Sequence, residues 1–193
     1  MTAPDATDTL GQAVLATLRH NFTSYKTLAD RALAQISPAE WLAEPAPGAN
    51  SAAVIVQHMV GNLHSRFTDF LTSDGEKPDR QRDLEFEQPG TEQAVASLQQ
   101  RWHATWPILF DLLDALQPAD LLRLVTIRGE AHTVLAALER QATHYAYHTG
   151  QLVQLAKHLR GNAWQTLSVP RGQSEQFNQQ MRARLNPTGH SGV

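Results

Sequence analysis

The sequence of 193 residues contains no cysteine. This absence excludes disulfide bonds, thiolate ligands to a metal ion and a cysteine nucleophile, so any thiol used in chemistry must come from another molecule. An excess of basic residues is also missing, because 16 Lys and Arg stand against 19 Asp and Glu for a net charge of −3. Without a basic footprint, nucleic acid is a poor candidate as a partner.

Long hydrophobic runs are missing as well. No stretch approaches the roughly 20 apolar residues that span a bilayer. The first residues, MTAPDATDTL, have neither the basic region nor the apolar run of a signal peptide. We therefore expect a cytoplasmic protein without a membrane partner, and a chain of 193 residues is long enough to bury one core.

Four segments carry apolar residues at helical spacing and predict long amphipathic helices. Their approximate ranges are 9–34, 51–71, 91–116 and 133–160. Gly161 is expected to stop the last of them, and Pro107 to kink the third. Four such helices in one domain predict an all-α fold, an up-down four-helix bundle.

The remaining segments are short. Residues 122–128 have β-branched character and predict a small strand, and residues 174–185 predict a short C-terminal helix. The polar segment 73–90 is too long for a plain connection, and we expect it either to cover a site or to cover an edge of the bundle.

These elements define the expected domain organisation. Residues 9–185 form one domain, preceded by a flexible N-terminus at 1–8 and followed by a disordered tail at 186–193.

The segment HYAYHTGQ, residues 144–151, contains the strongest candidate for a site. His144 and His148 are four residues apart on a predicted helix, so both imidazoles project from one face. At about 100° per residue that face coincides with the apolar arc of the helix, which turns both rings toward the interior. Two inward imidazoles one turn apart favour a shared metal ion over two separate hydrogen bonds.

A third ligand must come from another helix, and His58 is the best candidate. It lies beside the apolar arc of its helix, whereas His64 falls about 120° away on the other flank. Asn62 and Asp69 share the strip of His58 and are candidates for fixing its tautomer.

A structural interpretation competes with a metal site. A histidine pair at this spacing, taken alone, is more often structural than metal-binding.

Positions 145–147 are Tyr, Ala and Tyr, so the glutamate of an H-E-x-x-H protease motif is missing and a protease of that class is excluded.

Several segments resemble the DinB-like superfamily, in a branch known only as a domain of unknown function. The C-terminal segments HYAYHTGQLVQLAKHLRG (144–161) and WQTLSVPRGQSEQFN (164–178) are similar to its signature. Three central segments are similar to the same branch: HMVGNLHSRFTDFLTSDGEK (58–77), RDLEFE (82–87) and TIRGEAHTV (126–134). The similarity spans residues 10 to 180, nearly the whole chain.

The resemblance implies a bundle that commonly forms a homodimer and holds a divalent metal through three histidines. Carried over residue by residue, these ligands are His58, His144 and His148. Members of the wider superfamily transfer low-molecular-weight thiols or isomerise thiol adducts, whereas this branch has no assigned reaction. The resemblance therefore supports the presence of a metal site more strongly than it supports any particular activity.

The first hypothesis of function is a metal-dependent enzyme, a thiol transferase or a hydrolase. Three imidazoles leave coordination positions free for water or substrate, and Zn, Ni or Fe suits such ligands. Four arginines are candidates for holding the carboxylates of a thiol cosubstrate: Arg66, Arg80, Arg82 and Arg128. Their competing interpretation is ordinary solvation or pairing with Asp83, Glu85 and Glu130.

Tyr147 and Gln151 are further candidates for contacting the substrate or the histidines, whereas Tyr145 belongs to the apolar arc and is expected in the core. The second hypothesis is a metal-binding or stress-response protein without catalysis. A third is that the histidines stabilise the bundle or a dimer, with a structural or incidental metal.

Overall fold

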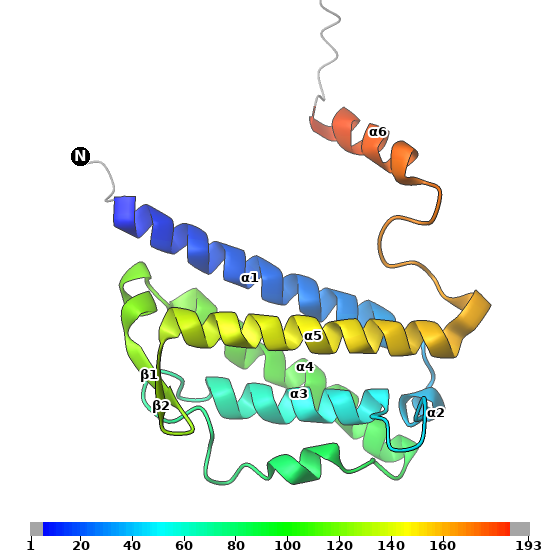
Figure 1. Cartoon of the computed structure of the whole chain (residues 1–193), viewed down its shortest axis with the longest axis horizontal. Helices are drawn as coiled ribbons and strands as arrows, with labels where there is room; N and C mark the ends of the chain where they lie inside the picture. Colours follow the sequence, from blue (N-terminus) through cyan, green and yellow to red (C-terminus); the bar gives the residue numbers. More distant parts are fainter. Residues whose placement is uncertain (1–5, 186–193) are drawn as a thin grey trace, which may run out of the picture.

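The computed structural model describes residues 6–185 (Figure 1). This part of the chain is mostly helical, with six α-helices, three 3₁₀ turns and a two-stranded sheet. In chain order the elements are α1 (Ala6–Leu33), α2 (Pro38–Trp41), α3 (Ala52–Phe67), η1 (Arg82–Phe86), α4 (Glu92–Ala115), η2 (Pro118–Leu122), β1 (Leu124–Ile127), β2 (Glu130–Thr133), α5 (Val134–Arg160), η3 (Gly161–Ala163) and α6 (Ser174–Leu185). Within residues 6–185, no helix has both the length and the apolar character needed to cross a membrane.

Hydroxyl caps fix where three of the long helices begin. The side chain of Ser51 accepts a hydrogen bond from the Val54 amide, and Thr91 and Thr133 cap α4 and α5 in the same way. Each cap satisfies an amide that has no partner inside the helix. These starts confirm the predicted ones.

The two ends of the chain differ from the expectation in one place. Helix α1 begins at Ala6, so residues 6–8, which the sequence assigned to a flexible N-terminus, are helical. The rest of that segment, 1–5, and the tail 186–193 lie outside the described residues. The predicted C-terminal helix is confirmed as α6, which Figure 1 shows standing away from the other helices.

The four long helices share one hydrophobic core. Helix α1 packs along α5, and α3 packs against both α4 and α5 (Figure 1). Large side chains without solvent contact fill the centre, among them Trp106, Tyr145 and Phe22. The Tyr145 ring meets the rings of Trp106 and Phe22 edge-on, at centroid distances of 5.6 and 5.9 Å. The expectation that Tyr145 is a core residue is therefore confirmed.

The segment 73–90 runs along α3 and is anchored to the hairpin of β1 and β2. Its η1 turn packs on α3, and the Gly75 amide donates to the Thr126 carbonyl at 2.8 Å. The Asp74 carboxylate accepts from the amides of Arg128 and Gly129, each at 2.8 Å. These bonds fix the path of the segment and so set where η1 meets α3.

The hairpin itself was only half predicted. The sequence indicated one strand, but β1 pairs antiparallel with β2, in a register that places Ile127 opposite Glu130. The two residues between them, Arg128 and Gly129, both have positive φ, at 57° and 74°. Such backbone angles form the tight turn that matches the twist of two paired strands.

Candidate metal centre

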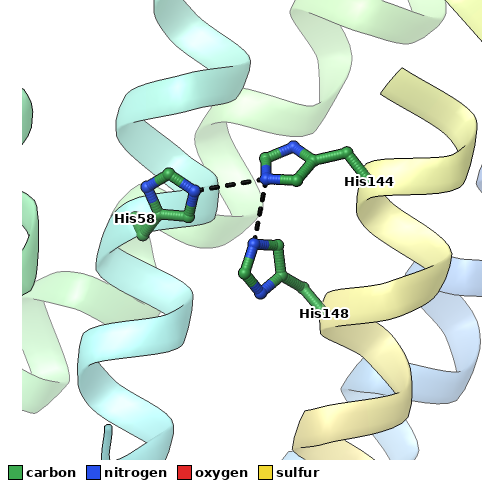
Figure 2. Close-up of side chains that lie close together, drawn as sticks. All are labelled: His58, His144 and His148. Carbon is green, nitrogen blue, oxygen red and sulfur yellow. Dashed lines mark hydrogen bonds between the residues drawn. The ribbon is translucent and has the colours of Figure 1, made fainter. Parts of the chain in front are cut away.

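Helices α3 and α5 bring three histidines together. His58 comes from α3, and His144 and His148 come from consecutive turns of α5 (Figure 2). The Nε2 atom of His144 lies 3.3 Å from Nε2 of His58 and 2.9 Å from Nε2 of His148. Ligand atoms of the three side chains all lie within 4.8 Å of one another. We call these residues the histidine cluster.

The cluster is largely removed from solvent. His58 is 5% exposed and His148 is 6% exposed, whereas His144 is half-buried. Aromatic rings of η1 and α5 border it. The ring centroids of Phe86 and His58 are 4.8 Å apart, and those of Tyr147 and His148 are 4.4 Å apart. The cluster therefore approaches solvent at His144, the least buried of the three rings.

The outer nitrogens of two rings are held by oxygen acceptors. Nδ1 of His58 lies 2.9 Å from Glu85 Oε2, and Nδ1 of His148 lies 2.8 Å from Gln151 Oε1. Because carboxylate and amide oxygens only accept, each Nδ1 carries a proton and donates it. A neutral ring in this tautomer has a free lone pair on Nε2.

The Nε2 atoms of His58 and His148 both point toward Nε2 of His144, as Figure 2 shows, so both of these lone pairs face that atom. That atom carries at most one proton, so it cannot donate a full hydrogen bond to both neighbours. A buried acceptor without a partner costs about 1–3 kcal/mol. One divalent cation accepts all three lone pairs at once, so the donor set fits a metal ion better than it fits a hydrogen-bond network.

Protonation of the rings does not remove this conflict near neutral pH. Burial lowers the pKa of His144 to about 3, and the nearby imidazoles of His148 and His58 lower it further in the same direction. Burial likewise lowers the pKa of His148 to about 4, against an opposing effect of Gln151. Both rings are therefore neutral at pH 7, the state in which imidazole binds a metal.

Glu85 links the histidine cluster to a buried chain of charges. Its side chain is 9% exposed, and Arg80 donates to both of its oxygens, from Nε at 2.7 Å and from Nη2 at 2.8 Å. Burial raises the pKa of the Glu85 carboxyl, but the hydrogen bonds from His58 and Arg80 outweigh burial and leave that pKa below its usual value. Glu85 is therefore an ionised carboxylate that orients His58.

The chain of charges continues away from the histidine cluster. Arg80 Nη1 donates to Glu76 at 3.0 Å, and the same carboxylate oxygen pairs with Arg66 at 3.1 Å and with Arg128 at 3.4 Å. Arg66 also donates to the Gly75 carbonyl. This network joins the histidine cluster to the segment that carries the hairpin contacts.

Gly61 allows Glu85 to come this close to α3. A Cβ atom at position 61 would lie 2.2 Å from Glu85 Oε1 and 2.6 Å from its carboxyl carbon. Such contacts are far inside van der Waals range. The absence of a side chain at position 61 is therefore what lets the carboxylate of η1 reach His58.

Comparison with known proteins identifies a family to which most of the chain matches. Residues 9–173 match the family described as "Protein of unknown function (DUF1572)". The chain belongs to this family. The matched region contains the histidine cluster, Glu85 and the segment that positions them. No curated protein and no solved structure shows significant similarity to the chain.

The outer partners of the histidines differ from the expectation in this DUF1572 chain. Asn62 does not hold His58, because its Oδ1 accepts from Gln141 Nε2 at 2.5 Å and from Tyr145 at 3.1 Å. Asp69 lies exposed beyond the end of α3, where its backbone carbonyl accepts from Ser73. The His58 tautomer is set by Glu85 instead, a residue that was expected only as a partner for arginine.

Two other candidates lie against the cluster. Gln151 holds His148, and the Tyr147 ring lies beside the His148 ring at a tilt of 51° while remaining 57% exposed. His64 is exposed on α3 and lies outside the histidine cluster, as its helical position predicted.

The four arginines are not equally free to hold a cosubstrate. Arg66 and Arg80 are buried and paired with Glu76 and Glu85, so the competing interpretation of internal pairing applies to them. Arg128 also pairs with Glu76, at 3.4 Å. Arg82 is about half exposed, lies 4.0 Å from the Asp83 carboxylate and lies 5.0 Å from the centre of the Phe86 ring, which borders His58.

Proposed function

We propose that this DUF1572 chain is a divalent-metal-binding protein of the DinB-like type, in which the four long helices form an up-down bundle. His58, His144 and His148 are the ligands. The observation that carries the proposal is the convergence of three Nε2 atoms while two of the rings are anchored through Nδ1. Imidazole donors of this kind suit Zn, Ni or Fe.

Three neutral nitrogen ligands leave at least one coordination position for water or substrate, which is typical of catalytic sites. A divalent ion held there lowers the pKa of a bound water or thiol and so supplies a nucleophile at neutral pH. Glu85 and Gln151 hold two of the ligand rings in orientation. Because the chain has no cysteine, a thiol must be a cosubstrate.

On this basis we propose a metal-dependent transferase that uses a low-molecular-weight thiol. Arg82 is the residue best placed to bind a carboxylate of that thiol, since it is half exposed and lies beside Phe86 at the edge of the histidine cluster. Arg66 and Arg80 instead neutralise Glu76 and Glu85.

A second candidate is a metal-binding or stress-response protein without catalysis. The observation that favours it is burial, because His58 and His148 are only 5% and 6% exposed. Turnover of thiol and acceptor by the metal-loaded protein separates the two candidates.

We also propose a homodimer. Three exposed leucines support it: Leu10 of α1, Leu122 of η2 and Leu124 of β1 are 66%, 75% and 70% exposed, and α1 packs against η2. Light scattering coupled to size-exclusion chromatography gives the mass. A monomer at all concentrations would contradict this proposal without affecting the metal site.

Elemental analysis of protein purified without a histidine tag tests the metal proposal. We expect close to one equivalent of metal in the wild type, and its loss in His144→Ala and in His148→Ala. His64→Ala is the matched control, because His64 is exposed on the same helix as His58. Absence of metal in the wild type, together with no uptake of added Zn, Ni or Fe, would overturn the proposal.

A further inference from the structure

A cavity of about 700 Å³ lies beside the histidine cluster. Its walls come from three parts of the chain: the loop before α3, including Pro45 and Ala49; the first turn of α3, at Ile55; and one stripe of α5, including Tyr147 and Gly150. We call it the α5 cavity. Its volume lies within the roughly 300–1,000 Å³ of small-molecule sites.

Two residues of the α5 cavity touch the cluster. Gln151 lines the cavity, and its Oε1 atom accepts a hydrogen bond from His148 Nδ1 at 2.8 Å. Tyr147 also lines it, and its ring lies 4.4 Å from the His148 ring. A molecule in the cavity is therefore separated from a proposed metal ligand by a single side chain.

The lining contains no carboxylate, ammonium or guanidinium group. No Asp, Glu, Lys or Arg contributes to it, and its polar groups are a phenol, the imidazole of His158 and the amides of Asn50, Gln151 and Gln154. The other walls are apolar, at Pro45, Ala49, Ile55 and Leu155. A charged ligand would lose hydration here without a carboxylate, ammonium or guanidinium group to pair with, whereas an apolar body with amide-type hydrogen bonding would be satisfied.

Gly150 keeps one wall of the α5 cavity open. It lies inside α5, where glycine is disfavoured by about 1 kcal/mol relative to alanine. A Cβ atom at this position would meet nothing within 4 Å, so no packing contact requires the glycine. The missing side chain leaves free space in the cavity, next to Tyr147 and Gln151.

We propose that the α5 cavity binds the body of an uncharged, largely apolar substrate whose reactive end reaches the histidine cluster. This inference rests on the proposed metal-binding function and names the substrate class of that site. In the proposed transferase it is the acceptor molecule, whereas the thiol is held beside Arg82.

Hydroxamic acids are suitable probes, because the same metal-binding head can be attached to different bodies. The zinc-loaded protein is titrated with acetohydroxamic acid, with phenylalkyl hydroxamic acids of several chain lengths, and with the same compounds carrying a carboxylate on the ring. The dissociation constants are measured by calorimetry for the wild type, for Gly150→Leu and for Ala104→Leu. The last variant adds the same side chain on the exposed surface of α4.

We expect at least one phenylalkyl compound to bind about tenfold more tightly than acetohydroxamic acid, since burying a ring adds that much or more. The ring carboxylate should abolish this gain. Gly150→Leu should abolish it as well while leaving zinc content, fold and acetohydroxamate affinity unchanged, because leucine suits a helix and its Cβ would meet nothing within 4 Å. Ala104→Leu should keep the gain.

The outcomes separate the two proposals. If zinc and acetohydroxamic acid bind but every phenylalkyl compound binds no more tightly, the α5 cavity is not a substrate site and the metal proposal stands. If the gain in affinity persists in Gly150→Leu, the phenylalkyl body does not bind in the α5 cavity. If the ring carboxylate increases the gain, the proposal that the substrate is uncharged is overturned. If no zinc is retained, the metal proposal and this inference both fail.

Discussion

At the residue scale, the protonation of each ring is determined by its partner on the outer side. Glu85 and Gln151 accept hydrogen bonds from Nδ1 of His58 and of His148, which turns two Nε2 lone pairs toward His144. The orientation of these histidines could be predicted from helical periodicity, because His144 and His148 are one turn apart on an apolar arc. Glu85 could not, since it lies 27 positions from His58 in a polar segment without periodicity.

We predict that Glu85→Gln weakens zinc binding about 10- to 100-fold, the usual effect of removing the carboxylate behind a metal-bound histidine. The variant keeps an oxygen for His58 but loses the charge that Arg80 holds with two hydrogen bonds. Competition with a chromophoric chelator gives the affinity. Glu87→Gln, an exposed neighbour, serves as the control. Equal affinities of the Glu85 variant and the wild type would show that Glu85 does not support the site.

We predict that the free energy of unfolding of the metal-free protein depends on pH. An unfolded imidazole titrates near 6.5, whereas the pKa of His144 is about 3 and that of His148 about 4 in the folded state. As pH falls from 6.5 toward 4, the unfolded chain binds protons that the folded chain does not, so the free energy of unfolding falls. Urea unfolding at pH 7 and pH 5 measures the loss, which should be smaller in His144→Gln. An equal loss in that variant would contradict the assignment.

At the element scale, the site depends on how η1 meets α3. Most of the helix boundaries could be predicted, because Ser51, Thr91 and Thr133 are cap residues directly before apolar periodic runs. The position of η1 could not be predicted, since it depends on contacts between distant segments, such as Asp74 with the turn at Arg128 and Gly129.

Substitution by alanine is predicted to have opposite effects at two helical glycines, stabilising the protein at Gly150 and impairing zinc binding at Gly61. Gly150→Ala should stabilise the protein by about 0.5–1 kcal/mol, because alanine is the better helix residue and its Cβ meets nothing within 4 Å. Gly61→Ala should lower zinc affinity and offset any gain in helix stability, because its Cβ would lie 2.2 Å from Glu85 Oε1. Thermal unfolding and zinc titration of both variants test this. Unchanged zinc affinity in Gly61→Ala would contradict the role of Glu85.

At the scale of the whole molecule, the histidine cluster joins α3 to α5, two helices of the shared core. The helical composition and the proximity of these three histidines were predictable from patterning, because buried faces leave a strong periodic signal. The α5 cavity was not, since it forms where a loop, α3 and α5 meet.

We predict that zinc raises the thermal stability of the wild type, since a ligand that binds only the folded state stabilises it by about 2.7 kcal/mol at a free concentration of 100 Kd. The midpoint of unfolding should increase with zinc concentration. His58→Ala should lose this response and His64→Ala should keep it. A response that survives in His58→Ala would place the metal elsewhere.

X-ray absorption spectroscopy of the protein loaded with one equivalent of zinc tests the central claim most directly, because it reports the type and number of ligands around the ion. The account predicts three imidazole nitrogens and at least one further ligand that an added hydroxamic acid displaces. A coordination shell with fewer than three imidazoles, or a closed shell of protein ligands that no added compound displaces, would contradict it.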